Sequence, residues 1–510
     1  MVEQLDHPRR LTRSFAETPS MRSVAPILLL ALAAHASPVT ASAQPSTASG
    51  PVGERTFREL VRLMNAGDRT ALRRFVDDRF VGDGPGALPP EQRVERLSDL
   101  HAAFGELDVR SVDTSKPREI AGLVQSTRTE TWRSMTLMLD EARPDRILRV
   151  RFAPARAPDA PTRRPSDAEL VAQLRAYVER MAKRDVFSGA VLLAKKGVPL
   201  YQAAFGEANK DFGVPNTPDT KFNLGSMNKM FTAVAAMQLV EAGKLSLDDT
   251  LGKFLPAGAM KPDVLSKVRV KHLLSHTSGL GSYFTPEWDR QSRALWRSVN
   301  DWMPLIKDDS LQFEPGTRWS YSNTGMLVMG KVIEVASGQD YFTYVREHVA
   351  KPAGMTSTDA YELDRVNRNL AVGYEREGED ANGPIYRNNI FQHVIRGGPA
   401  GGGYSTVGDL TRFAEALKAG KLVSQASVRL LTTPKPELAS PEYGFGFGVE
   451  EGGRVVGHSG GFNGINSQLD IYVGEDYSLA VMSNYGDGAQ PIIEKARSLM
   501  LAGQGRTASR

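Results

Sequence analysis

Residues 222–243, FNLGSMNKMFTAVAAMQLVEAG, begin as a polar turn and continue as an apolar run. The apolar residues predict a buried helix that ends at Gly243. Lys229 nevertheless stands on the first turn of this helix, three positions after Ser226. A charged lysine is costly to bury unless it is paired or loses its proton. Its place at the start of a buried helix therefore needs a chemical or a structural reason.

Ser226 and Lys229 form the only S-x-x-K pattern in the chain, and residues three apart share one face of a helix. A desolvated lysine has a lowered pKa and can accept the proton of a serine hydroxyl. Backbone N–H groups at a helix start also favour negative charge. The pattern predicts a nucleophile with its base. The alternative is a helix-capping serine beside a lysine that extends to solvent.

A second segment, WSYSNTGMLVMGKVIEVASG, carries side chains that such a site would need. Tyr321 and Asn323 lie two residues apart, just before an apolar helix that stops at Gly338. The tyrosine can share in proton transfer, and the asparagine can bind Lys229 and a substrate carbonyl. For Asn323 the alternative is a helix-capping role.

A third segment, GHSGGFNG, follows a predicted strand and contains His458, Ser459, Gly460 and Gly461. Glycines allow a substrate to lie against the edge of a strand. The N–H of Gly461 can join that of Ser226 as an oxyanion hole. The alternative is a glycine-rich strand end with a surface histidine.

Six blocks in this order resemble the serine β-lactamase and penicillin-binding-protein-like hydrolases, above all the class C β-lactamase and esterase branch. The blocks are FNLGSMNKMFTAVAAMQLVEAGKLSLDDTLGKFLP, VKHLLSHTSGL, FEPGTRWSYSNTGMLVMGKVIE, PAGGGYSTVGDLTRF, YGFGFGVE and HSGGFNG, spread over Asp167 to Gly503. The resemblance implies an α+β fold, in which helices flank an antiparallel sheet and a helical lobe is added.

The resemblance also implies roles for individual residues. Ser226 would be the acylated nucleophile, Lys229 its base, Tyr321 the second proton-transfer residue and Asn323 a positioning amide. No metal ion and no organic cofactor is expected in this chemistry.

One motif departs from the family pattern, because K-T-G becomes H-S-G at His458, Ser459 and Gly460. A lysine there is charged near neutral pH and helps to hold the β-lactam carboxylate, whereas a histidine is often neutral. Histidine at this position is also common in the esterase and peptidase relatives. The departure therefore favours an esterase or a peptidase over a β-lactamase.

We expect an exported serine hydrolase that forms an acyl-enzyme on a small ester, amide or peptide. A carboxylesterase, a D-stereospecific peptidase acting on cell-wall fragments and a β-lactamase all share the machinery, and the esterase is preferred. A non-catalytic module that binds peptidoglycan or a partner protein is the alternative from another class. The presence of Ser226, Lys229 and Tyr321 together argues against it.

Residues 44–152 predict a separate small α+β domain. Helical patterns come first, with a break at residues 66–68, and four strands joined by short turns follow from residue 107. The order resembles the cone-shaped nuclear-transport-factor-2-like domains. A linker rich in Pro, Ala and Arg, residues 153–166, would join it to the hydrolase domain, residues 167–505.

Residues 1–43 predict an export signal. A basic residue after Met21 precedes the apolar run VAPILLLALAAHA, and small residues at 41–43 suggest a cleavage point. The run is shorter than the roughly 20 residues that span a bilayer, so no stable membrane anchor is expected. Met21 is the expected true start, with a twin-arginine signal as the alternative. The expected location is the periplasm or the medium.

Composition narrows the possibilities further. The chain has 510 residues, 41% hydrophobic and 24% charged, which is typical of a soluble protein with two domains or one large one. The net charge of +4 is not concentrated in one run, so no nucleic-acid partner is expected. The absence of cysteine excludes disulfides and thiolate metal sites. We interpret His272 and His276, which lack a third ligand, as structural rather than zinc-binding.

Overall fold

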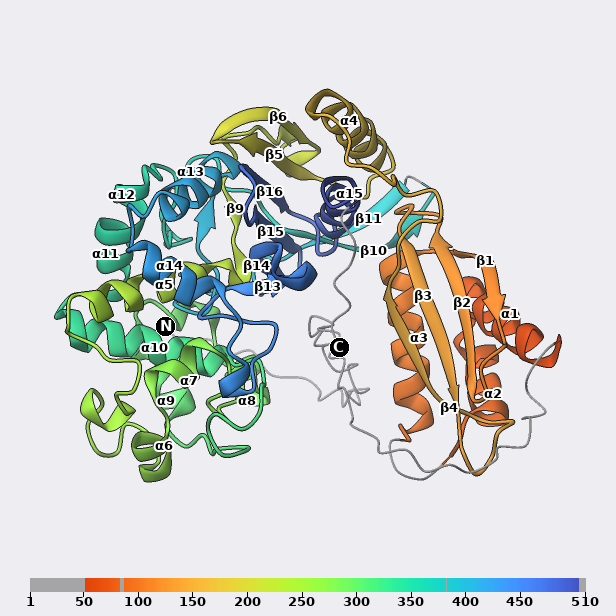
Figure 1. The fold of residues 1–510 in the computed structure, drawn as a ribbon, viewed down its shortest axis with the longest axis horizontal. Helices are drawn as coiled ribbons and strands as arrows, with labels where there is room; N and C mark the ends of the chain where they lie inside the picture. The colour runs from red at the N-terminus through yellow and green to blue at the C-terminus, as the bar shows by residue number, and fades with distance from the viewer. Residues whose placement is uncertain (1–50, 83–86, 382, 504–510) are drawn as a thin grey trace, which may run out of the picture.

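The computed structural model describes residues 51–82, 87–381 and 383–503. The signal region expected at residues 1–43 lies outside the described residues. The described chain forms two parts that stand beside each other, a smaller one up to Pro154 and a larger one from Asp167 (Figure 1). The boundaries of the two domains, and the likeness of the smaller one to nuclear-transport-factor-2-like domains, stay predictions.

The smaller part packs helices on one antiparallel sheet, as the sequence predicted. Its elements are α1 (Pro51–Ala66), α2 (Arg69–Arg79), α3 (Pro90–Phe104), β1 (Leu107–Asp113), β2 (Glu119–Ser126), β3 (Trp132–Leu139) and β4 (Ile147–Pro154). The strands follow one another in the order β1-β2-β3-β4. Buried and half-buried residues alternate along β2 and β3, because successive side chains point to opposite faces of a sheet.

The larger part is built on a six-stranded sheet in the order β13-β14-β15-β16-β5-β6. Its strands are β5 (Gly189–Lys195), β6 (Val198–Phe205), β13 (Gly448–Glu450), β14 (Val455–Phe462), β15 (Ile465–Tyr472) and β16 (Tyr477–Ser483). Antiparallel pairing of β16 with β5 joins the last strand of the chain to the first strand of this part. The two ends of the larger part therefore meet in one antiparallel sheet.

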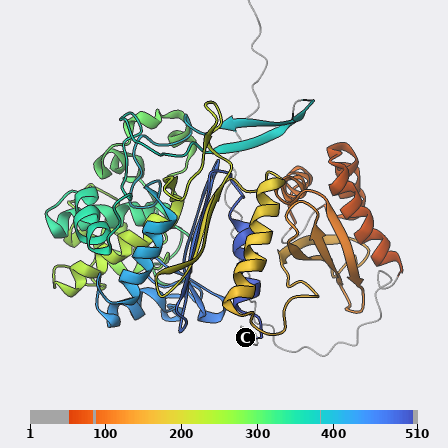
Figure 2. The ribbon, with the colours of Figure 1, turned by 90° about the horizontal axis from the view of Figure 1, so that it is seen from above.

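Helices cover both faces of this sheet. On one face, α4 (Asp167–Lys183) and α15 (Gln490–Met500) share a hydrophobic core with β5 and β16. Figure 2 shows these two helices between the sheet and the smaller part. On the other face, α5 (Asn228–Glu241) and α13 (Val407–Lys418) belong to a second, larger core. The fold is therefore the predicted antiparallel sheet flanked by helices.

The remaining elements form the helical lobe and its connections. The other helices are α6 (Pro262–Lys267), α7 (Val270–Leu274), α8 (Pro286–Arg290), α9 (Val299–Ile306), α10 (Asn323–Ser337), α11 (Tyr341–Val345), a π-helix η4 (Arg346–Ala350), α12 (Lys351–Ala353) and α14 (Gln425–Thr432). Short 3₁₀ turns are η1 (Gly225–Met227), η2 (Leu251–Lys253), η3 (Arg293–Leu295), η5 (Pro436–Leu438) and η6 (Glu451–Gly453). Paired short strands are β7 (Glu207–Asn209) with β8 (Val214–Pro215), β9 (Phe222–Asn223) with β12 (Tyr404–Ser405), and β10 (Tyr374–Asp380) with β11 (Gly383–Asn388).

Polar contacts join the two parts. Arg133 of β3 donates two hydrogen bonds to Glu494 of α15, at 2.7 and 2.8 Å, and the arginine side chain is only 4% exposed. Arg180 of α4 binds Glu130, on the turn before β3, at 2.9 Å. The smaller part is thereby held against the helix layer, on the face of the sheet away from α5.

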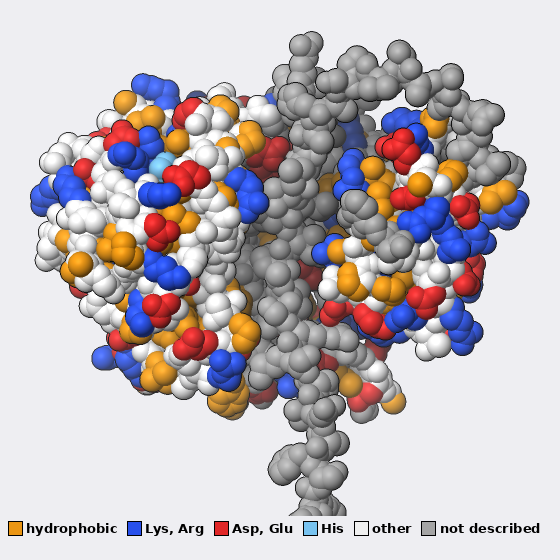
Figure 3. Space-filling model, turned by 90° about the horizontal axis from the view of Figure 1, so that it is seen from below, with side chains coloured by type: hydrophobic (Ala, Val, Ile, Leu, Met, Phe, Trp, Pro, Cys, Tyr) orange, Lys and Arg blue, Asp and Glu red, His pale blue; other side chains and the backbone are white. Residues whose placement is uncertain are grey.

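The outer surface carries charges of both signs. On the face that Figure 3 shows, blue and red side chains of the described residues are interspersed on both parts. Among the described helices, none has the length and apolar character needed to cross a bilayer.

Candidate active site

Ser226 lies on the 3₁₀ turn η1, which leads directly into α5. Gly225 adopts a positive φ of 50°, and a Cβ atom there would come within 2.7 Å of the Gly461 nitrogen. On the other side, the N–H of Gly402 donates to the Gly225 carbonyl at 3.1 Å. The turn is thus packed between β14 and a glycine-rich loop. This close packing needs glycines and leaves the serine half-buried.

Lys229 is completely buried on the first turn of α5. Its Nζ lies 2.9 Å from Ser226 Oγ, 2.9 Å from Asn323 Oδ1 and 2.5 Å from the Ala400 carbonyl oxygen. Burial holds the pKa of the Lys229 ammonium well below its usual range. The alternative of a lysine that extends to solvent is wrong, and the capping alternative fails too, because the serine oxygen contacts the lysine.

The three partners of Lys229 differ in what they can do. The Ala400 carbonyl and Asn323 Oδ1 can only accept hydrogen bonds. A neutral amine has two N–H groups and one lone pair. Once deprotonated, Lys229 would satisfy the two obligatory acceptors with its hydrogens and direct its lone pair at the hydroxyl of Ser226. This arrangement suits a base that takes the proton of the serine.

Asn323 begins α10 but does not cap it. The capping residue is Ser322, whose side chain accepts from the Gly325 N–H at 2.8 Å. The amide of Asn323 is left for the site, where its Nδ2 donates to Ser282 Oγ at 3.2 Å. That bond fixes which end of the amide faces Lys229. The capping role that was the alternative for Asn323 is wrong.

Tyr321 completes the group around Ser226. Its phenol lies beside the serine side chain, and burial raises the pKa of the phenol. The Lys229 Nζ lies 4.8 Å from the centre of its ring. The ring of His276 packs on it at 4.4 Å, and His276 Nδ1 accepts from the Ser322 N–H at 3.2 Å. His276 therefore supports the loop that carries Tyr321.

His458 lies on β14, buried and held on both ring nitrogens. Nδ1 is 2.5 Å from the Ser459 carbonyl oxygen and Nε2 is 2.9 Å from the Tyr443 hydroxyl. Because a carbonyl can only accept, Nδ1 carries the hydrogen and Nε2 accepts from Tyr443. Burial, together with nearby Lys229, lowers the pKa of His458 to about 3. The imidazole is therefore neutral near pH 7, and it is not a surface histidine.

The end of β14 brings Gly461 to the nucleophile. The hairpin to β15 closes on the pair Phe462 and Ile465. Hydrogen-bonded and non-bonded pairs alternate along an antiparallel ladder, so the N–H of Gly461 points away from β15. Gly460 packs so tightly that a Cβ atom would come within 1.9 Å of the Leu224 carbonyl oxygen. Ser459, one residue earlier, is exposed on the same edge.

The turn that follows Gly461 is clamped by the β10–β11 hairpin and the segment after it. The N–H of Gly464 donates to the Glu375 carboxylate on β10. Asn389 Nδ2 donates to the Asn463 carbonyl oxygen at 2.7 Å. Burial raises the pKa of Glu375. These contacts fix the end of the strand that carries the Gly461 N–H.

Several partners were missed by sequence reasoning. Lys229 binds the backbone carbonyl of Ala400, and the residue type at a position does not predict such a contact. Tyr443 and Ser282 fall in or beside segments that resemble the family, but their partners became clear only from the fold. Among the described residues, no group of three or more His, Cys, Asp or Glu side chains could hold a metal ion.

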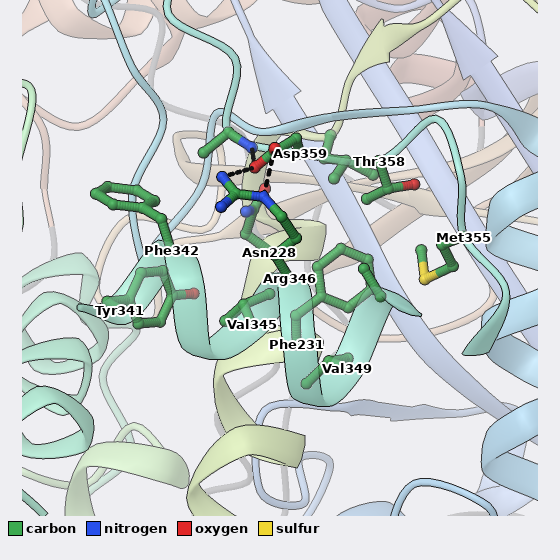
Figure 4. A pocket seen from close by; sticks show the side chains of 13 residues that line it. Asn228, Phe231, Tyr341, Phe342, Val345, Arg346, Val349, Met355, Thr358 and Asp359 are labelled. Atoms are coloured by element: carbon green, nitrogen blue, oxygen red, sulfur yellow. Dashed lines mark hydrogen bonds and ion pairs between the residues drawn. The ribbon is translucent and has the colours of Figure 1, made fainter. Parts of the chain in front are cut away.

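A separate pocket lies behind α5 (Figure 4). It encloses about 420 Å³, including space open to solvent, and its lining includes Asn228, Phe231 and residues of η4. An ion pair of Arg346 with Asp359, at 2.9 Å, crosses it. None of the residues predicted for the site lines this pocket.

Comparisons with known proteins agree with the geometry. The family model described as Beta-lactamase matches residues 174–504. Penicillin-binding protein 4* of Bacillus subtilis (strain 168) is 32% identical over 356 residues, which cover 65% of this chain and 76% of that protein.

Two solved structures share the fold of the larger part. A penicillin binding protein from Bacillus halodurans superposes with a TM-score of 0.57 at 29% identity, over 64% of this chain and 98% of the other. A D-stereospecific amidohydrolase from Streptomyces superposes with a TM-score of 0.52 at 27% identity, over 65% and 98%.

Proposed function

The chain belongs to the Beta-lactamase family of serine hydrolases, and from this premise we propose that it is an exported esterase with Ser226, Lys229 and Tyr321 as catalytic residues. The observation that carries the proposal is the buried Lys229 Nζ, 2.9 Å from Ser226 Oγ and bound to two obligatory acceptors. A deprotonated amine held there is a base for the serine hydroxyl.

In the first step, Ser226 Oγ attacks the carbonyl carbon of the ester while its proton moves to Lys229. The carbonyl oxygen becomes an oxyanion, which the N–H groups of Ser226 and Gly461 would hold. Asn323 keeps the lysine in place through its Oδ1. Its side chain and the strand edge at Ser459 and Gly460 would also position the substrate.

The tetrahedral intermediate then collapses and the carbon–oxygen bond to the alcohol breaks. Tyr321, whose phenol stays protonated because burial raises its pKa, would pass a proton to the departing alcohol and regain one from Lys229. Water attacks the acyl-enzyme in the same way and releases the acid. The balance is ester plus water giving acid plus alcohol, and the scheme needs neither a metal nor an organic cofactor.

The neutral His458 supports an ester substrate over a β-lactam. With its pKa lowered to about 3 and both ring nitrogens bonded, it offers no charge to a substrate carboxylate. Its ring lies 6.4 Å from that of Tyr321, so it would shape the site from beside the proton-transfer residue.

Hydrolysis of a D-stereospecific amide or peptide is the second candidate. The likeness to the Streptomyces amidohydrolase at 27% identity favours it, and the same residues would act in the same steps. The substrate in either case is a small ester, amide or peptide.

Location and domain division belong to the proposal. Residues 1–43 would direct export to the periplasm or the medium. Residues 44–152 would form the smaller domain, and residues 153–166 would link it to the hydrolase domain at 167–505.

The experiment compares p-nitrophenyl butyrate hydrolysis by the mature chain with that of its Ser226→Ala variant. We expect kcat/KM to fall by at least about 10³-fold in the variant. Ser498→Ala, on α15 at the far face of the sheet, is the matched control and should behave as wild type.

Each other outcome has a definite meaning. Equal activity of wild type and Ser226→Ala would show that Ser226 is not the nucleophile. Inactivity on esters with cleavage of D-alanyl peptides would replace the esterase by the second candidate. Failure of an active phosphonate to label Ser226, seen by mass spectrometry, would leave a non-catalytic binding module.

A further inference from the structure

Two phenylalanines from distant segments stack at the end of β14. The rings of Phe284 and Phe462 lie 5.9 Å apart with an interplanar angle of 25°. Phe284 is 44% exposed, so part of its ring faces solvent. Two residues before it, Ser282 accepts the hydrogen bond of Asn323. The stacked pair is thereby tied to the site through a side chain that also holds Lys229.

The position of Phe462 on β14 indicates where the stacked pair lies relative to the nucleophile turn. Alternate residues of a strand point to the same face, so Phe462 shares the face of His458 and Gly460. That face packs against the nucleophile turn, as the tight approach of Gly460 to the Leu224 carbonyl shows. Four residues of strand separate Phe462 from His458 by roughly 13 Å.

This position indicates which half of the ester, the acyl group or the leaving alcohol, lies toward the stacked pair. In the proposed scheme the leaving alcohol takes its proton from Tyr321, whose ring lies 6.4 Å from that of His458. The oxyanion would be held near Gly461, which lies between His458 and Phe462 along the strand. The acyl group, on the other side of the carbonyl carbon, then extends toward Phe462.

The surroundings of the pair are apolar and uncharged. Phe284 packs on Trp288 at 4.8 Å, and Phe462 packs on His393 at 5.5 Å. Burial lowers the pKa of His393 to about 4, so this ring is neutral near pH 7.

The cation that packs on Trp288 is already engaged. The guanidinium of Arg293 lies 3.4 Å from the centre of the Trp288 ring. Its Nη1 donates to the carbonyl oxygens of Trp288 and Gln291, and its Nη2 lies 3.6 Å from Asp289. An acidic acyl group that packs against Phe284 and Phe462 would therefore lose its hydration without gaining a charged partner.

We propose that Phe284 and Phe462 bind the acyl group of the substrate, and that the preferred acyl group is uncharged and aromatic. The inference rests on the proposed function and names the substrate class of that site. An aromatic ring can extend the existing stack, whereas a short acyl chain leaves Phe284 exposed to water.

The test varies the acyl group of p-nitrophenyl esters while the leaving group stays constant. The substrates are acetate, butyrate, phenylacetate and hemisuccinate, and each kcat/KM is divided by the rate of hydroxide-catalysed hydrolysis of the same ester. We expect phenylacetate to exceed acetate by about tenfold or more, and hemisuccinate to fall below butyrate. The Phe284→Ala variant should lower the phenylacetate value more than the acetate value, so that most of the phenylacetate preference is lost.

Phe212→Ala is the matched control, because Phe212 is 81% exposed and lies on the turn between β7 and β8. Phe462→Leu, a milder change on the strand, should reduce the same preference. A preference that survives in both Phe284→Ala and Phe462→Leu overturns the inference. The inference is also overturned if, in a series of acetate esters, the loss of activity in Phe284→Ala depends on the alcohol part of the ester. Phe284 and Phe462 would then bind the leaving group.

The outcomes separate this inference from the proposed function. If Ser226 is required for hydrolysis of every ester but no acyl group is preferred, only the aromatic acyl site is wrong. If no ester is hydrolysed in a Ser226-dependent way, both the proposed esterase activity and the acyl site are wrong.

Discussion

At the scale of single residues, Lys229 and His458 show two outcomes of burying a base. Burial lowers the pKa of both side chains. His458 has both nitrogens engaged by groups that do not react, whereas Lys229 directs one of its three contacts at Ser226. The partners therefore decide whether a lowered pKa supports structure or chemistry.

The pH dependence of hydrolysis should report on Lys229. Its pKa is lowered, so the lysine is neutral above that pKa and gains a proton as the pH falls through it. We expect kcat/KM to fall on the acid side with a slope of one proton. Lys229→Arg should lose at least about 10³-fold at every pH, because an arginine stays protonated. Steady-state rates with p-nitrophenyl butyrate across the stable pH range provide the measurement.

Lys435 provides the matched control for that profile. Burial also lowers its pKa, but its Nζ contacts the Thr433 carbonyl and the ring of Phe445. In the Lys435→Met variant, the fall of kcat/KM at acid pH (the acid limb) should occur at the same pH as in wild type. An acid limb that persists in an active Lys229→Met variant would assign the base to another group.

Much of this site could be predicted from the order of side chains, because the chemistry depends on residue types at short spacings. Ser226, Lys229, Tyr321 and Asn323 were expected together. The structure places Lys229 Nζ 2.9 Å from both Ser226 Oγ and Asn323 Oδ1, and 4.8 Å from the centre of the Tyr321 ring. The Ala400 carbonyl could not be predicted, since every residue has one and only the fold brings this one to Lys229.

At the scale of elements, the turn after β14 depends on a hairpin that never touches the nucleophile. The turn that follows Phe462, at the end of β14, is Asn463–Gly464. Glu375 and Asn389 bind both residues of that turn through the backbone. The β10–β11 hairpin and the segment after it therefore position the Gly461 N–H indirectly.

Removing this support should weaken the proposed oxyanion hole. We expect Glu375→Ala to lower the acylation rate by about tenfold, as a fraction of the 10²–10³-fold that loss of an oxyanion donor costs. Glu375→Gln should recover most of the rate, because its amide oxygen can still accept from the Gly464 N–H. Pre-steady-state acylation by p-nitrophenyl butyrate gives the measurement.

Glu377 is the control on the same hairpin. It is exposed and pairs with Arg387 across the two strands, so Glu377→Ala should acylate at the wild-type rate. Equal rates in Glu375→Ala and wild type would remove the hairpin from the account of the site.

The limits of elements were harder to predict than their order. The third of the four strands expected after residue 107, for example, begins only at Trp132. Glu130 has a positive φ of 58°, and the hydroxyls of Thr129 and Thr131 bond to each other at 2.7 Å. Local side-chain bonds of this kind compete with a sheet ladder, and hydropathy does not reveal them.

At the scale of the whole molecule, one ion pair between the two parts is almost fully enclosed. Arg133 is 4% exposed and Glu494 is 20% exposed, and the two share a bidentate contact. Arg133 also packs against the ring of Phe104 at 4.5 Å. Nothing in the sequence of either part marked these residues as partners, because they lie on segments far apart in the chain.

Loss of one partner should destabilise the junction. We expect Arg133→Met to lower the free energy of unfolding by about 2 kcal/mol, less than the roughly 3–5 of a fully buried pair, because Glu494 keeps some contact with water. The Arg133→Met/Glu494→Leu double variant should recover part of that loss. Denaturant unfolding followed by tryptophan fluorescence provides the measurement.

The control is an exposed pair on α1, Arg62 with Glu59. Arg62→Met should change stability by less than about 0.5 kcal/mol, since surface pairs contribute little. An Arg133→Met variant as stable as the Arg62→Met control would mean that the enclosed pair does not hold the two parts together.

The pairing of β5 with β16 has a consequence for synthesis of the chain. The central strands at residues 189–195 and 477–483 come from opposite ends of the larger part. A growing chain on the ribosome can complete the smaller part soon after residue 154, because domains tend to fold as units from the N-terminus. The larger sheet must wait until residue 483 has emerged, since until then β5 lacks β16, one of its two neighbouring strands.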